Sequence, residues 1–307
     1  MASQEAITIT ETKKKGFAGQ WLEKNDSRIK DLRYSARLFF KSPMAVLGLL
    51  IILMFVILAL ATPYIAPYGD NQRNWYEIMK PPSAQHWFGT DDMGGDVFSR
   101  VLWGSRVSLT VGFVVVFTAI VIGAVVGGIS GYFGGIIDEL MMRVTDIFLA
   151  FPYLIFAMVI CAALGRSSQN VMIALAITWW PTYARIIRGQ ALTVREQKYI
   201  EAAKAVGGTD RHIIFRHLLP NSLSPIIVQS TMDLGNVILT AAALSFIGFG
   251  AQAGAAEWGR MVSDGAQFMM TSPWIVTFTG LAILLACLGF NLFGDGLRDI
   301  MDPKMRR

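Results

Sequence analysis

Residues 195–220 read REQKYIEAAKAVGGTDRHIIFRHLLP, a charged segment set between two strongly apolar stretches. Its first half is rich in helix formers as far as Gly207-Gly208, a pair that accepts the left-handed backbone found at helix ends. Thr209 is a good N-cap for a second helix, which we expect to end at Pro220. The segment is therefore predicted to form a helix, a sharp bend and a second helix that together present a docking surface.

The composition places the rest of the chain in a membrane. The 307 residues are 53% apolar and 16% charged, with a mean hydropathy of +0.47, whereas soluble domains are about a quarter charged. The net charge of +5 is not gathered into a basic face, so we expect lipid and no nucleic acid as a partner. Cys161 and Cys287 lie inside apolar runs, which indicates neither a disulfide framework nor a metal site.

Apolar runs of spanning length recur along the chain, since about twenty such residues cross a hydrocarbon layer of about 30 Å. We expect an all-α membrane protein with six transmembrane helices. The helices are predicted at residues 44–66, 107–129, 144–164, a fourth after residue 170 that Pro181 should kink, 225–249 and 273–293. The remaining segments are predicted as an inner head (1–43), an outer segment (67–106), an inner loop (190–224), an outer loop (250–272) and an inner tail (294–307), with residues 107–293 as the helical core.

The distribution of basic residues predicts which side each segment occupies. Short segments rich in Lys and Arg stay in the cytoplasm. With both termini cytoplasmic, 21 of the 27 Lys and Arg fall on inner segments and 6 on outer ones. The inverted topology would require moving the basic head and the basic loop 190–224 across the membrane, so we discard it.

Small residues recur at every fourth position in the second predicted helix, at Ala119, Gly123, Gly127 and Gly131. One face of this helix is thus almost bare backbone, which indicates close packing against a neighbouring helix.

Asp233 is an acidic residue inside the fifth predicted helix, about 12 Å along it from Pro225. A carboxylate at that depth should face protein or water rather than lipid. Two interpretations stay open: a hydrogen-bond partner at a helix interface, or a residue of a solute pathway.

Enzymatic interpretations find little support. Residues 128–131 fit the Gly-x-Ser-Gly pattern of rhomboid-type proteases, but their Ser130 would need a histidine base from another spanning helix. The histidines, His86, His212 and His217, are all predicted outside the bilayer. A phosphate-binding Gly-x-x-x-x-Gly-Lys-Ser/Thr loop is also absent from the sequence, so the chain is not itself an ATPase.

A stand-alone secondary transporter or channel is the remaining alternative to a subunit that depends on partners. Ion coupling usually needs ionisable groups within the membrane and often leaves internal repeats. Only Asp146, near a helix end, and Asp233 are such groups, and no convincing repeat is present.

The segment 195–220 resembles the EAA loop of ABC importer permeases, which is the coupling helix that an ATPase subunit grips. The matching residues are Glu201, Ala202, Ala203, Gly207, Leu219 and Pro220, and His217 stands where the family has Ile. Three further stretches are similar to the oligopeptide and dipeptide branch, and in particular to its second, C-type inner-membrane permease subunit. They are GTDDMGGDVFSR (89–100, with Gly95 in place of Arg), ALSFIGFG (243–250) followed by EWG (257–259, with Ala253-Gly254 in place of Pro-Pro), and GDGLRD (294–299).

This resemblance implies the type I ABC importer permease fold in a bacterial inner membrane, with segment 67–106 on the periplasmic side. It also implies a homologous permease subunit, two cytoplasmic ATPase subunits that carry ATP-Mg, and an extracytoplasmic solute-binding protein as partners. The permease itself would have no catalytic site and no cofactor. Di- or oligopeptides are the expected solute, while nickel, glutathione or a sugar stays open.

Overall fold

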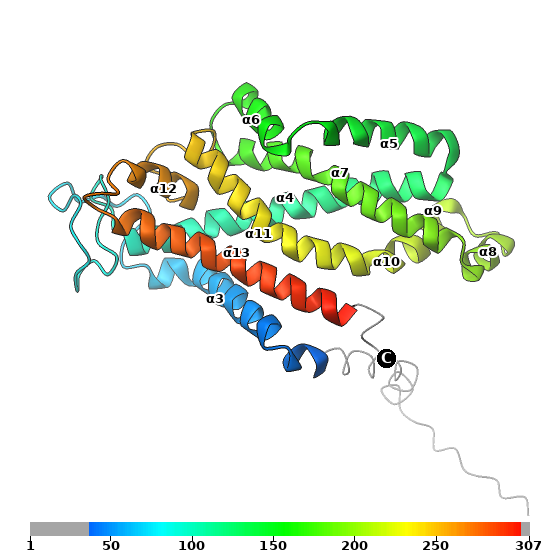
Figure 1. The fold of residues 1–307 in the computed structure, drawn as a ribbon, viewed down its shortest axis with the longest axis horizontal. Coiled ribbons are helices and arrows are strands. Elements are labelled where there is room, and N and C mark those ends of the chain that lie inside the picture. The colour runs from blue at the N-terminus through cyan, green and yellow to red at the C-terminus, as the bar shows by residue number, and fades with distance from the viewer. Residues whose placement is uncertain (1–36, 302–307) are drawn as a thin grey trace, which may run out of the picture.

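The computed structural model describes residues 37–301, which form helices and loops without a β-strand in that range. Long helices run side by side along the molecule, with the loop-rich segment 66–96 and α12 at one end and α8 at the other (Figure 1). The helices are α3 (Pro43–Ile65), α4 (Val97–Phe133), α5 (Gly135–Ala150), α6 (Tyr153–Leu164), α7 (Ser168–Arg195), α8 (Lys198–Ala205), α9 (Asp210–Ile213), the π-helix η1 (Ile214–Leu218), α10 (Leu219–Asn221), α11 (Leu223–Ile247), α12 (Trp258–Ala266) and α13 (Trp274–Met301).

Four helices of the described chain are long and apolar enough to cross a membrane: α3, α4, α11 and α13. The bent pair α5–α6 makes a fifth if it is counted as one span. The helix expected after residue 170 is α7, which begins slightly earlier, at Ser168, and has 28 residues, but it does not reach the apolar content of the others. The arrangement of six spans with both termini in the cytoplasm therefore stays a prediction.

The prediction of a single helix at residues 144–164 is wrong. The chain forms α5 and α6 instead, which meet at an angle of 87° across Phe151 and Pro152. Phe151 is extended, with φ −91° and ψ 139°, because the ring of a following proline disfavours helical backbone at the residue before it. Pro181 has no such effect on the secondary structure, since α7 continues through it.

Two helices extend beyond their predicted bounds. α4 begins at Val97, ten residues before the expected start, because the Asp96 side chain accepts a hydrogen bond from the Ser99 N–H at 2.8 Å and caps the helix. The outer segment predicted at 67–106 is thus shorter than expected. α13 continues to Met301, so the tail predicted at 294–307 begins with helix. Most of the head predicted at 1–43, and residues 302–307, lie outside the described residues.

The most extensive contact between long helices joins α4 to α7, and it is a close one, as the spacing of small residues predicted. A Cβ atom added to Gly127 would come within 2.3 Å of the Ala184 carbonyl oxygen, and one added to Gly123 within 2.5 Å of the Tyr183 Cβ. Both distances are far below an ordinary van der Waals contact. The two backbones can therefore lie together only where α4 has glycine.

Side-chain and backbone contacts bind the outer segment to the start of α4 and to the outer loop. Arg100 forms a buried ion pair with Asp91 and donates to the carbonyls of Gly254 and Ala255 at 3.1 and 3.0 Å. Trp258 Nε1 donates to the Val101 carbonyl at 3.0 Å. These contacts hold three separate stretches of the chain in one outer cap.

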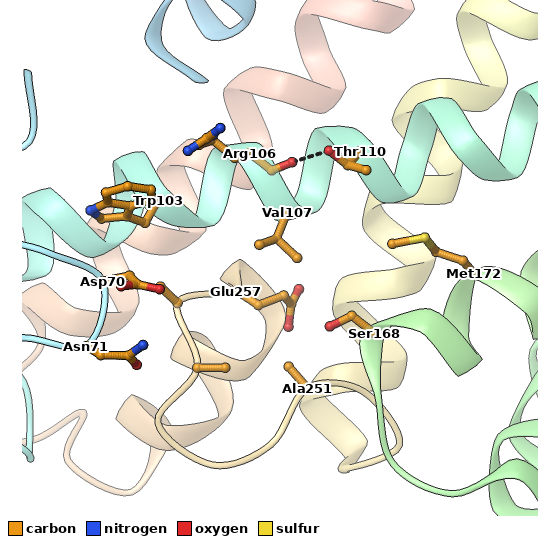
Figure 2. A pocket seen from close by; sticks show the side chains of 12 residues that line it. Asp70, Asn71, Trp103, Arg106, Val107, Thr110, Ser168, Met172, Ala251 and Glu257 are labelled. Carbon is orange, nitrogen blue, oxygen red and sulfur yellow. Dashed lines mark hydrogen bonds between the residues drawn. The ribbon is translucent and has the colours of Figure 1, made fainter. Parts of the chain in front are cut away.

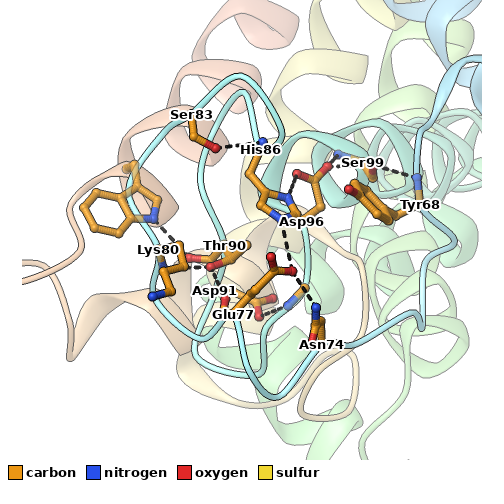
Figure 3. Close-up of polar contacts among 12 residues, drawn as sticks. Tyr68, Asn74, Glu77, Lys80, Ser83, His86, Thr90, Asp91, Asp96 and Ser99 are labelled. Atoms are coloured by element: carbon orange, nitrogen blue, oxygen red, sulfur yellow. Dashed lines mark hydrogen bonds and ion pairs between the residues drawn. The ribbon is translucent and has the colours of Figure 1, made fainter.

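A second set of contacts organises the outer segment itself (Figure 3). The buried His86 lies 2.9 Å from Asp96 through Nδ1 and 3.4 Å from Glu77 through Nε2. Thr90 Oγ1 accepts from the Lys80 N–H at 2.8 Å and donates to the Glu77 carbonyl at 2.5 Å. Because Asp96 also caps α4, the loop is anchored on a helix end.

We expect Gly127→Leu to lower the unfolding midpoint of the purified protein, because its side chain would force α4 and α7 apart at a cost of about 1–3 kcal/mol. Gly280→Leu in α13 is the matched control, since a Cβ there meets nothing within 4 Å. Equal midpoints for the two variants in a thermal melt would contradict this packing.

Candidate functional site

The segment between α7 and α11 forms the helix, bend and second helix that the sequence predicts, at the end of the molecule opposite the outer cap (Figure 1). We call residues 196–222 the coupling segment. α8 is its first helix, and α9, η1 and α10 follow each other as its second. We expected the second helix to end at Pro220, but α10 continues to Asn221. After the single residue Ser222, α11 begins at Leu223.

The bend is built by two glycines with different tasks. The Gly208 N–H donates to the Ala203 carbonyl and the Gly207 N–H to the Lys204 carbonyl, both at 2.9 Å, which is the Schellman arrangement of a helix end. Gly207 has φ +83°, as the sequence predicted, a backbone angle that residues with a Cβ rarely adopt. Gly208 is needed for clearance instead, because an added Cβ would lie 2.7 Å from the Ala203 oxygen.

The second helix contains a π-turn. The Leu219 N–H donates a hydrogen bond to the carbonyl of Ile214, five residues earlier. Pro220 has no N–H and so donates no helical hydrogen bond. The Asn221 side chain donates to the His217 carbonyl at 2.5 Å. A local widening of this kind is often found at functional sites, and here it joins the coupling segment to α11 without a loop.

The coupling segment has a small hydrophobic core of its own, separate from the main core of the bundle. Its members come from the end of α4, the end of α7, α8 and the second helix: Tyr132, Ala191, Val194, Ile200, Ile213, Ile214 and Leu218. Ala203 packs against this cluster, and Leu219 packs against both cores. The segment therefore packs against the ends of α4 and α7, and Leu219 connects its core to the main core.

Tyr132, at the end of α4, ties the two halves of the coupling segment together. Its hydroxyl donates to Asp210 Oδ1 at 2.6 Å, and Lys204 Nζ lies over its ring at 5.2 Å from the centroid. Sequence reasoning missed this residue because Asp210 is 78 positions away. The one available signal was an aromatic side chain among the small residues at the end of α4.

The predicted coupling residues occupy two surfaces. Glu201, Ala202 and Pro220 are exposed, and Glu201 forms no salt bridge within residues 37–301. Ala203 and Gly207 line an open groove of about 410 Å³, together with Val206, Gly208, Thr209, His212 and His217.

Large apolar side chains beside this groove face outward. Val206 is 86% and Phe215 66% exposed. The coupling segment thus exposes both charged and apolar side chains, a mixture that suits a protein partner.

Asp233 lies inside the bundle, on α11, and is 5% exposed. Its Oδ1 accepts from Gln229 Nε2 at 3.1 Å. The side chain lines a cavity between α11, α7 and the break between α5 and α6, so it does not face lipid. Both interpretations of its role, helix interface and pathway, are compatible with this position.

A further cavity of about 550 Å³ opens at the outer end, between the start of α4, the start of α7 and the outer loop (Figure 2). Glu257 reaches its wall while accepting hydrogen bonds from the N–H groups of Gly259 and Arg260 at 3.0 and 2.8 Å. Burial raises the pKa of this carboxyl group, and the two N–H donors oppose that rise. Arg106 lies over the Trp103 ring at 5.4 Å, so both signs of charge border the cavity.

Comparison with known families identifies this architecture. The chain belongs to the family described as binding-protein-dependent transport system inner membrane component, whose model matches residues 123–307. Residues 32–82 match the N-terminal transmembrane domain of oligopeptide transport permease C. The protein is thus a multi-pass permease subunit of an ABC importer in the bacterial inner membrane, and as a transport permease it is not itself an enzyme.

Individual relatives share most of their length with this chain. The dipeptide transport system permease protein DppC of Alkalihalophilus pseudofirmus is 48% identical over 87% of this chain and 88% of its own length. The probable D,D-dipeptide transport system permease protein DdpC of Escherichia coli K12 is 48% identical over 86% and 88%. The glutathione transport system permease protein GsiD of Pectobacterium atrosepticum is 40% identical over 88% and 90%.

A solved structure supports the fold. The inward-facing MetNI methionine ABC transporter has a chain that matches 66% of this one and 96% of its own length, with a TM-score of 0.54 at 20% identity. The protein therefore has the type I importer permease fold, which the sequence predicted.

Replacing Tyr132 by Phe should loosen the coupling segment without unfolding the bundle. Loss of a hydrogen bond to a carboxylate costs about 1.5–3 kcal/mol, so amide hydrogen exchange in α8 and α9 should become at least about tenfold faster. Tyr199→Phe is the control, because the Tyr199 hydroxyl makes no hydrogen bond within the described chain. Unchanged exchange in the Tyr132 variant would show that this contact does not hold the segment.

Proposed function

We propose that the coupling segment passes the motion of ATPase subunits to the membrane helices of an ATP-driven importer. The observation that carries the proposal is that this segment is packed around a core of its own and bound to both α4 and α11. A partner that grips Glu201, Ala202 and the adjacent groove would therefore move two long helices at once. Packed elements of this kind change between discrete arrangements rather than deforming continuously.

The proposed assembly contains partners that this chain needs for its energy and its solute. A homologous permease subunit would complete the pathway, giving a heterodimer, and two cytoplasmic ATPase subunits would bind ATP-Mg. An extracytoplasmic solute-binding protein would deliver solute to the outer cap formed by segment 66–96 and the outer loop. The sequence lacks a phosphate-binding loop, which supports assigning ATP hydrolysis to the partners.

We further propose a di- or oligopeptide as the solute. The relatives are named for dipeptides, D,D-dipeptides and glutathione. These compounds share amide bonds, a free amine and a carboxylate, so one chemical class covers all three. Glutathione is the alternative that these names support directly.

The proposed topology places the coupling segment in the cytoplasm and the outer cap in the periplasm, following the charge bias. Cysteines introduced by Val206→Cys and Tyr76→Cys test it, since these side chains are 86% and 93% exposed. In intact cells a membrane-impermeant maleimide should label position 76 only, while position 206 should react only after the membrane is opened. The reverse pattern would overturn the topology.

Glu201→Lys should weaken the hold of the ATPase subunits by about tenfold or more, because it reverses an exposed charge on the proposed contact surface. Co-purification and uptake measure the effect, while membrane insertion should be normal. Glu196→Lys is the matched control, an exposed acidic residue of the same segment just before α8. Gly207→Asp should act similarly by straining the bend. If Glu201→Lys and Gly207→Asp both bind and transport as the control does, the segment is not the coupling element.

A further inference from the structure

The cavity beside Asp233 has the size and lining of a small-molecule site. Its volume is about 580 Å³, within the range of about 300–1,000 Å³ for ligand pockets. Its walls come from the break between α5 and α6, from α7 and from α11. The residues that line it are Leu149, Phe151, Pro152, Tyr153, Thr178, Trp179, Thr182, Gln229, Asp233, Asn236, Leu239 and Thr240.

Asp233 is the single Asp, Glu, Lys, Arg or His in this lining. The groups around its carboxylate are neutral donors, from Tyr183 and Trp179 on α7 and from Gln229 and Asn236 on α11. Of these, Gln229 is at hydrogen-bond geometry, at 3.1 Å from Oδ1. Oδ2 and the neighbouring Tyr183 hydroxyl are both buried, and neither has a hydrogen-bond partner among the residues that the structure describes.

Asp233 also lacks a cationic partner, since none of the salt bridges within residues 37–301 includes it. By contrast, Asp138 and Asp146, toward the coupling end, pair with Arg188 and Arg185. A buried carboxylate without a cation is costly unless a ligand supplies one. The cavity is thus built for a positive charge that the described chain does not provide.

The aromatic residues specify what kind of cation fits. Tyr153 and Trp179 stand edge to face across the cavity wall, with ring centroids 5.4 Å apart, and aromatic faces attract organic ammonium groups. A divalent metal is less suited, because it prefers several carboxylate or imidazole ligands, and no group of three such residues lies within the described range.

We propose that Asp233 forms a subsite for the protonated amine of a passing peptide, in the cavity between α5–α6, α7 and α11. The inference rests on the proposed peptide import. The carboxylate would hold the N-terminal ammonium by a charge-assisted hydrogen bond, while the aromatic wall covers the adjoining apolar side chain.

Charge-selective labelling in the assembled transporter tests the site without depending on transport. Cys161 and Cys287 are first replaced by Ala, and Thr182→Cys places a thiol on the cavity wall. The cationic reagent aminoethyl methanethiosulfonate should react about tenfold faster than the anionic sulfonatoethyl reagent, because a nearby negative charge attracts the first and repels the second. Asp233→Asn should remove that preference, whereas Asp146→Asn, at an exposed ion pair, should retain it.

Equal rates for the two reagents in the chain that keeps Asp233 would overturn the proposal. That result would mean that the Asp233 side chain carries no negative charge in the assembled transporter, as expected for a structural residue at a helix interface.

Uptake of alanyl-alanine provides the second measurement. Asp233→Asn should lower uptake by about tenfold, with ATP hydrolysis stimulated by the loaded binding protein changed less than about twofold, since the coupling segment is intact. A parallel fall of uptake, hydrolysis and complex yield would assign Asp233 a structural role and overturn the subsite. Absence of alanyl-alanine uptake by the unmodified transporter would count against the proposed peptide function, while the labelling result would still decide the charge of the cavity.

Discussion

The close approach of α4 and α7 is the contact on which the rest of the fold depends. Without Cβ atoms at Gly123 and Gly127, the α4 backbone touches the α7 backbone, and dispersion and helix–helix contacts replace the hydrophobic effect, which is absent between helices in lipid. The pair also fixes both functional ends. α4 carries Arg100 of the outer cap at its start and, at its end, Tyr132, which binds the coupling segment.

The secondary structure of the coupling segment could be predicted from the sequence because its signals are local. Gly207-Gly208 predicted the bend because few other residues accept its backbone angles, and the small-residue repeat predicted the α4 face. The start of α4 was missed, although Asp96 and Ser99 have the spacing of an N-cap, because Arg100 and Arg106 interrupt the apolar residues that follow and the stretch was assigned to the outer segment. The break at Phe151-Pro152 was missed because apolar composition outweighed the local effect of the proline.

Other features could not be obtained from one sequence. Tyr132 and Asp210 meet only because α4 and the coupling segment are brought together by α7, and no local pattern encodes a contact over 78 residues. The cavity beside Asp233 is assembled from three separate stretches. The sequence indicated that this carboxylate avoids lipid, but its lack of a cation is a property of the tertiary structure.

α10 passes almost directly into α11. A movement of the second half of the coupling segment would therefore tilt α11, as the short arm of a lever moves the long one. α11 has 25 residues, or about 38 Å at 1.5 Å per residue. A tilt of about 10° at the coupling end would carry the far end sideways by about 6–7 Å, more than the width of a peptide backbone. Under the proposed coupling, a rotation of about 10° would therefore displace the far end of α11 without any helix having to melt.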